Sequence, residues 1–176
     1  MCIRDSIKTM IYAFTELKMR IDKVRLYILG DVDDPEYKEE CVQLIEMLGV
    51  KDIVFTGPVN VVEYMEKFDF TILTSISEGQ PLSVLESFAA ARPAVTTDVG
   101  CCRELIYGRT QDELGQAGFL VPPMHREELA NAMERMCLDT EMRNKMGVIA
   151  QKRVERYYTH EISMNQYREL YKEVIM

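Results

Sequence analysis

Two glutamates separated by seven residues flank the start of a predicted helix. Glu78 and Glu86 lie in residues 75–86, directly after the apolar run of residues 70–74. Pro81 suits the first turn of a helix, where free N–H groups and the helix dipole favour an anion such as a phosphate. An ionised carboxylate instead accepts paired hydrogen bonds from neighbouring hydroxyls. The pattern predicts a ligand with hydroxyls at both ends and a diphosphate between them, which is the layout of a nucleotide-sugar.

The first turn of this helix supplies the rest of the predicted site. We expect unpaired N–H groups at Leu82, Ser83 and Val84, and a further donor in the Ser83 hydroxyl. Glu86 lies one turn further and can reach back along the face that carries Leu82, because helical side chains lean toward the N-terminus. The alternative is purely structural, since acidic residues near a helix start stabilise the dipole by about 0.3–1 kcal/mol.

Strands and helices must alternate to place these residues at the end of a strand. Apolar residues recur with helical spacing in some segments and form short continuous runs in others. This alternation predicts a Rossmann-like α/β fold, a parallel sheet flanked by helices. We expect strands at 24–29, 53–55, 70–74, 94–96 and 118–121, and helices at 7–17, 41–48, 60–65, from 81, 127–137, 140–157 and from 160.

Composition excludes several classes of protein. The chain has 176 residues, enough for one sizeable core, and its net charge of −8 argues against a nucleic-acid partner. No apolar run approaches the length of a membrane span, and no signal peptide is visible. The five cysteines and two histidines lack metal-ligand spacing. We therefore expect no metal and no cofactor, and reduced thiols in a cytoplasmic protein.

The glutamate pair also resembles a known motif. Glu78 and Glu86 are similar to the E-x7-E motif of retaining glycosyltransferases of family 4, which have the GT-B fold. The commoner form of this motif has an aromatic residue and a glycine where this chain has Gln80 and Pro81. Residues 73–82, 97–108 and the acidic run 30–37 are similar to a narrower subgroup, the PelF-like cytosolic glycosyltransferases of Pel exopolysaccharide synthesis. The resemblance covers about residues 7–175 and implies the C-terminal half of a GT-B fold.

The resemblance assigns roles within the motif. It implies that Glu78, the catalytic-site candidate, binds hydroxyls of the donor sugar and that Glu86 binds the ribose. The donor is expected to be UDP-glucose or another UDP-hexose, and neither glutamate is assigned as a nucleophile. The implied donor-binding set is Gly79, Gln80, Pro81, Leu82, Ser83 and Glu86.

Four residues after the next strand are candidates for the edge of the site. Asp98, Val99 and Gly100 end that strand, and Glu104 follows in a predicted turn. Their alternative role is structural, as a turn and a capping interaction.

The start of the chain differs from the fold that it resembles. That fold begins with a strand and a glycine-containing basic loop for the diphosphate, whereas a helix opens this chain. Residues 1–6 are a candidate non-native leader before a donor-binding domain at 7–176. The expected loss of the first strand, normally central in the sheet, would expose strand edges on both sides. The resemblance also implies a missing N-terminal acceptor domain, so we expect no sugar transfer by the fragment alone.

The last predicted helix has two interpretations. It carries an apolar face that either crosses back to the acceptor domain, as the resemblance suggests, or packs on its own sheet. The residues of this face are Met164, Tyr167, Leu170, Tyr171 and Val174. Membrane-associated subunits of an exopolysaccharide synthase are further candidate partners.

Other functions fit parts of the sequence. Asp31 and Asp33 form a DxD pattern after a strand, which in another glycosyltransferase fold holds a divalent metal, although residues 34–36 look like the acidic start of a helix. A nucleotide-sugar epimerase, a phosphorylase and a non-catalytic nucleotide-sugar-binding subunit share the predicted fold. His125 and His160 are weaker candidates for a catalytic base, since neither lies near Glu78 in the predicted strand order.

Overall fold

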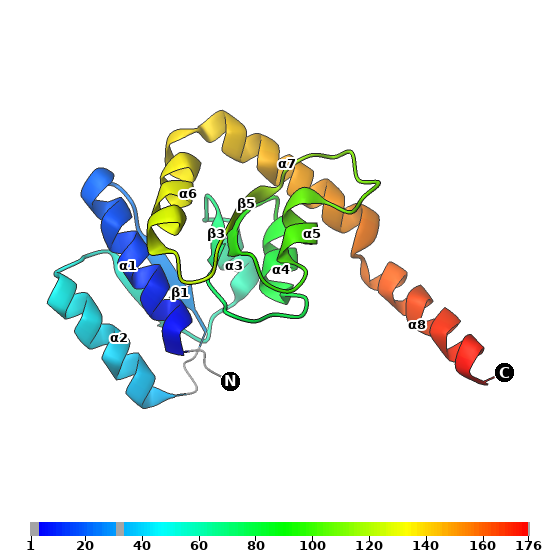
Figure 1. Ribbon diagram of the computed structural model, residues 1–176, viewed down its shortest axis with the longest axis horizontal. Coiled ribbons are helices and arrows are strands. Elements are labelled where there is room, and N and C mark those ends of the chain that lie inside the picture. Colours follow the sequence, from blue (N-terminus) through cyan, green and yellow to red (C-terminus); the bar gives the residue numbers. More distant parts are fainter. Residues whose placement is uncertain (1–3, 31–33, 176) are drawn as a thin grey trace.

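The computed structural model describes residues 4–30 and 34–175. Helices and strands alternate from α1 to α6, and two further helices follow (Figure 1). The elements are α1 (Arg4–Arg20), β1 (Leu26–Leu29), α2 (Pro35–Leu48), β2 (Ile53–Gly57), α3 (Val61–Met65), β3 (Thr71–Leu73), α4 (Leu82–Ala89), β4 (Ala94–Thr97), α5 (Cys102–Tyr107), β5 (Gly118–Val121), α6 (Arg126–Leu138), α7 (Thr140–Tyr157) and α8 (His160–Ile175).

The described strands pair in parallel, as predicted, but in two groups. β1 pairs with β2, whereas β3, β4 and β5 form a separate group in that order. No ladder joins β1 to β3 within the described residues. The α/β fold with parallel strands and flanking helices is therefore confirmed.

Alternation along β4 shows that both faces of the sheet are buried. Val95 packs in a cluster with Phe14 of α1 and Met133 of α6. The preceding residue, Ala94, packs instead in a cluster with Phe88 of α4. Successive side chains of a strand point to opposite faces, so α1 and α6 cover one face and α4 covers the other. Such two-sided burial is typical of parallel sheets.

The ends of α2 agree with the sequence. One carboxylate oxygen of Asp34 accepts hydrogen bonds from the backbone N–H groups two and three residues later. Gly49 ends the helix in the left-handed conformation, with φ 61°. Residues 34–36 thus begin a helix, which supports the structural alternative to a DxD metal site. Asp31 and Asp33 themselves lie outside the described residues.

Helix α5 corrects one prediction. Glu104 was expected in a turn, but it lies in the first turn of α5. Cys102, Leu105 and Ile106 share the buried side of this helix. With only six residues it is too short to show the repeated apolar spacing by which helices are predicted.

Helix α8 extends away from the rest of the chain (Figure 1). Its apolar side chains Met164, Tyr167, Leu170 and Tyr171 are 38–62% exposed. This exposure argues against the interpretation that the face packs on its own sheet. Of the helices described, none combines the length and apolar character needed to cross a membrane.

Candidate functional site

The loop from β3 to α4 lies at the carboxyl end of β3 and is tied to the neighbouring strand. Thr97, the last residue of β4, is 1% exposed, and its Oγ1 donates to the carbonyl oxygen of Ser75 at 2.6 Å. The N–H of Asp98 donates to the carbonyl oxygen of Val121 at 2.8 Å, which ties the ends of β4 and β5. Ligands of open α/β sheets bind at this edge. The predicted site therefore lies where such a sheet binds ligands.

Glu78 is half-buried and oriented by a neighbouring side chain. The hydroxyl of Ser75 donates to Glu78 Oε1 at 2.6 Å. No other donor of the described chain bonds this carboxylate, so Oε2 remains available for a ligand hydroxyl. Neither Ser75 nor Thr97 was predicted as a site residue. The position of Ser75, three residues before Glu78 in a loop, was the signal that could have identified it.

Gly100, a predicted residue of the site edge, packs against the segment that carries Glu78. Its φ is +51°, and a Cβ at this position would overlap the carbonyl oxygen of Glu78 and lie 2.6 Å from that of Gly79. The N–H of Cys101 donates to the Gly79 carbonyl oxygen at 3.1 Å. The loop after β4 thus packs directly on the Glu78–Gly79 backbone. The edge candidate Gly100 is therefore in direct contact with the motif.

Helix α4 begins next to Pro81, as predicted, but its first turn differs from the prediction. Pro81 is the residue before the first helical residue, and its carbonyl oxygen accepts hydrogen bonds from Val84 N at 3.2 Å and Leu85 N at 3.4 Å. The expectation of a free N–H at Val84 is therefore wrong, because a tight first turn uses this group. The N–H groups of Leu82 and Ser83 have no acceptor within the described chain. Two donors remain for an anion.

Glu86 lies one turn into α4 on its exposed side. Leu82, four residues earlier, is 69% exposed, whereas Ser87 and Phe88 are buried. Residues four apart share a helix face, so the Glu86 side chain lies above Leu82, as expected. Along the chain, Glu78 in the loop precedes the two free N–H groups and Glu86 in the helix follows them.

Asp98 and Glu104 both have protein partners. Arg103 donates to the Asp98 carboxylate. Glu104 Oε1 accepts hydrogen bonds from Tyr158 Oη at 2.6 Å and from Arg109 Nε at 2.5 Å. The hydrogen bond from Tyr158 lowers the pKa of Glu104, and Arg109 adds to this effect, against the opposing effect of burial. These bonds are structural, and a ligand contact at either carboxylate stays a prediction.

Val99 forms part of the turn before α5. Its N–H donates to the carbonyl oxygen of Thr97 and its carbonyl accepts the N–H of Cys102, both at 3.0 Å. His125 lies beside Glu128, with Nδ1 3.7 Å from the carboxylate, and His160 begins α8. Neither histidine bonds the Glu78 loop in the part of the chain that the structure describes.

Charge decides what this arrangement can bind. Residues 75–86 contain two glutamates and no lysine or arginine. Within this segment, an anion can meet only the neutral N–H groups and the positive end of the helix dipole at α4. The two carboxylates suit uncharged hydroxyl donors on either side of that anion. The segment thus offers acceptors for hydroxyl groups and neutral donors for an anion.

Comparison with known families places the chain among glycosyl transferases. Residues 2–139 match the family described as glycosyl transferases group 1. A curated relative is the N-acetyl-alpha-D-glucosaminyl L-malate synthase of Bacillus anthracis, 27% identical over 96% of this chain and 42% of the relative. An exopolysaccharide phosphotransferase of Streptomyces coelicolor is 33% identical over 86% of this chain and 15% of its own length. The chain thus spans less than half of each.

A solved structure has the same fold. Anabaena HepE in complex with UDP-glucose superposes with a TM-score of 0.81 at 23% identity, covering 94% of this chain and 44% of HepE. At this identity the likeness concerns the fold.

Proposed function

This chain belongs to the family of glycosyl transferases group 1, and we propose that it forms the donor-binding domain of a hexosyltransferase. The proposed donor is UDP-glucose or another UDP-hexose. Sugar transfer itself belongs to the longer protein of which this chain would be part, because the chain spans 42% of the Bacillus anthracis relative. We propose that the transfer retains the anomeric configuration.

Each group of the site has a proposed role. Glu78, held by Ser75 at 2.6 Å, accepts hydrogen bonds from hydroxyls of the donor sugar. Glu86 accepts the two ribose hydroxyls side by side. The free N–H groups of Leu82 and Ser83 bind a phosphate oxygen between them. We expect binding without a divalent metal.

One observation carries the proposal: a helix start with two free N–H groups lies between two glutamates along the chain. Gly100 packs against the Glu78 carbonyl and so constrains the position of the loop that carries Glu78. A nucleotide-sugar needs a hydrogen-bond acceptor for its sugar hydroxyls, donors for its diphosphate and a second acceptor for its ribose hydroxyls, in this order. The complex of HepE with UDP-glucose supports the choice of ligand, because HepE shares the fold.

The biological setting is a finer proposal. We assign the parent protein to exopolysaccharide synthesis in the cytoplasm, as a PelF-like enzyme, from the similarity of residues 73–82 and 97–108 and from the exopolysaccharide phosphotransferase among its relatives. Free thiols at Cys41 and Cys102 agree with a reducing compartment. The exposed apolar side chains of α8 are the proposed contact with an acceptor domain, and subunits of a membrane-associated synthase are further proposed partners.

Titration of UDP into variants tests the nucleotide part of the site. Glu86→Ala removes a charged acceptor of two hydrogen bonds, which costs about 1.5–3 kcal/mol. We expect the Kd for UDP to rise roughly 10- to 150-fold by this loss. Glu46→Ala is the matched control, because Glu46 is an exposed helical glutamate on α2, outside the site.

Three further measurements complete the test. ADP and GDP should bind more weakly than UDP, and EDTA should leave the UDP affinity unchanged. Glu78→Ala should reduce affinity for UDP-glucose more than for UDP, because its role is on the sugar. An unchanged affinity for UDP in Glu86→Ala would show that the ribose role is wrong.

A further inference from the structure

A hydroxyl at the end of β4 continues the contact between β3 and β4 beyond their last paired residues. The parallel ladder between the two strands ends at Leu73 and Thr96. One residue later, the buried Thr97 Oγ1 donates a hydrogen bond to the backbone carbonyl oxygen of Ser75 at 2.6 Å. Ser75 is therefore held by β4, although it lies in the loop after β3.

The Ser75 side chain connects this anchor to Glu78. Its hydroxyl donates to Glu78 Oε1 at 2.6 Å, and among the donors of the described chain only this group bonds the carboxylate. The backbone on either side of Glu78 is held by other groups, since Thr97 bonds the Ser75 carbonyl and Cys101 N–H bonds the Gly79 carbonyl at 3.1 Å. Different hydrogen bonds thus fix the loop backbone and the direction of the carboxylate, so a substitution can separate the two effects.

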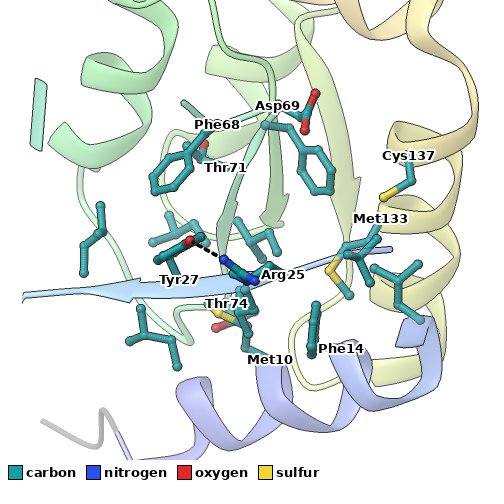
Figure 2. A pocket seen from close by; sticks show the side chains of 18 of the residues that line it. Met10, Phe14, Arg25, Tyr27, Phe68, Asp69, Thr71, Thr74, Met133 and Cys137 are labelled. Atoms are coloured by element: carbon teal, nitrogen blue, oxygen red, sulfur yellow. Dashed lines mark hydrogen bonds between the residues drawn. The ribbon is translucent and has the colours of Figure 1, made fainter. Parts of the chain in front are cut away.

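Ser75 also lies close to the start of α4. Together with Thr74 and Ser83 it lines a cavity of about 720 Å³ between β1 and β3 (Figure 2). Ser83 carries one of the two free N–H groups of α4. The residue that orients Glu78 and a donor for an anion therefore border the same cavity, which agrees with a single ligand that reaches both.

We propose that Thr97 and Ser75 are positioning residues for the donor sugar: Thr97 places Ser75, and Ser75 directs the Glu78 carboxylate so that Oε2 faces a sugar hydroxyl. These roles rest on the proposed function, in which Glu78 binds the sugar and Glu86 binds the ribose. The two hydroxyls bond the Glu78 loop and not the free N–H groups of α4. Their effect should therefore be confined to the sugar part of the donor.

Orienting Glu78 before the ligand arrives has a measurable consequence for affinity. Without the Ser75 hydroxyl, the Glu78 side chain would lose its rotational freedom only when the sugar binds. Immobilising one such side chain weakens binding roughly 3- to 10-fold. We expect a loss of this size when the Ser75 hydroxyl is removed, and only for ligands that contain the sugar.

Titration of UDP-glucose and UDP into variants of the chain tests these roles. The ratio of the Kd for UDP-glucose to the Kd for UDP isolates the sugar part of the site. Ser75→Ala should raise this ratio roughly 3- to 10-fold and leave the Kd for UDP unchanged, whereas Ser75→Thr, which keeps the hydroxyl, should restore the ratio. Thr97→Val should also raise it and Thr97→Ser should not. Ser77→Ala is the matched control, because Ser77 is an exposed serine of the same loop.

A double-mutant cycle separates positioning of Glu78 from general support of the loop. If Ser75 acts through Glu78, Ser75→Ala should not raise the ratio further in a Glu78→Ala background. A purely structural role would raise it equally in both backgrounds. The Ser75 variants keep the Thr97 anchor, which bonds the backbone, so they test the roles even where Thr97→Val does not fold.

The outcomes distinguish this inference from the proposed function. An unchanged ratio in Ser75→Ala, an equal rise in Ser77→Ala, or additive effects of Ser75→Ala and Glu78→Ala would overturn the positioning roles while Glu78 still binds the sugar. An unchanged ratio in Glu78→Ala, or no binding of UDP by the unsubstituted chain, would overturn the proposed function and the positioning roles with it.

Discussion

Replacing Gly100 by alanine should damage the candidate site specifically. A Cβ in the left-handed conformation costs about 1–2 kcal/mol wherever it occurs. At Gly100 the added atom also overlaps the Glu78 carbonyl oxygen and approaches that of Gly79 to 2.6 Å. Both neighbours are backbone atoms, so relief requires the loop itself to move. Overpacking of this kind typically costs a further 1–3 kcal/mol, for a total of about 2–5 kcal/mol.

Gly49 provides a matched control. Its φ of +61° is close to the +51° of Gly100, but a Cβ at Gly49 would meet nothing within 4 Å. Gly49→Ala should therefore carry only the conformational cost of about 1–2 kcal/mol. Urea unfolding of both variants measures this difference, and UDP titration measures its effect on the site. For a domain of this size the extra 1–3 kcal/mol corresponds to a melting temperature roughly 2–12 °C lower.

The two variants should differ in binding as well as in stability. Gly100→Ala should weaken UDP binding, because the loop carrying Glu78 is displaced, and Gly49→Ala should leave it unchanged. Equal destabilisation by the two variants, or unchanged UDP affinity in Gly100→Ala, would refute the packing of the two loops described above.

Two further predictions concern buried polar groups. Arg153 is 0% exposed and its Nε lies 2.7 Å from Asp112. Because Arg153→Met leaves a buried carboxylate unpaired, it should lower the free energy of unfolding in urea by roughly 3–5 kcal/mol. A loss under about 1 kcal/mol would contradict this. The Tyr158 hydrogen bond lowers the pKa of Glu104 from 4.5, so its stabilisation is present above about pH 4.5 and is lost as the pH falls through the lowered folded pKa. Tyr158→Phe should therefore lower stability near neutral pH and flatten its decline in acid; parallel profiles of the two proteins would argue against the bond.

Local patterns were enough to predict most elements. The helical spacing at residues 41–48 and the glycine that follows predicted α2, because both signals act within a few residues. The segment around Glu78 and Glu86 was predicted as loop and helix for the same reason. The part that was wrong is the free N–H of Val84, because residue types do not reveal that the first turn uses this group.

Contacts between distant segments could not be predicted. The packing of Gly100 on the Glu78 carbonyl joins two loops through backbone atoms, and no side-chain pattern encodes it. Arg153 and Arg156 lie on the same helix with similar neighbours in sequence. Only the fold shows that Arg153 is buried beside Asp112 whereas Arg156 is exposed. Arg153 and Asp112 are 41 residues apart, whereas hydrophobic periodicity relates only residues a few positions apart, so it cannot predict their pairing.

The most direct test of the proposed site is to map UDP binding on the backbone amides. Uniformly ¹⁵N-labelled chain titrated with UDP at millimolar concentrations reports even weak binding, residue by residue. The largest shifts should fall on Gly79, Leu82 and Ser83, and Glu86→Ala should reduce them whereas Glu46→Ala should not. Shifts centred elsewhere, or no shifts at saturating nucleotide, would contradict a nucleotide-sugar site at the start of α4.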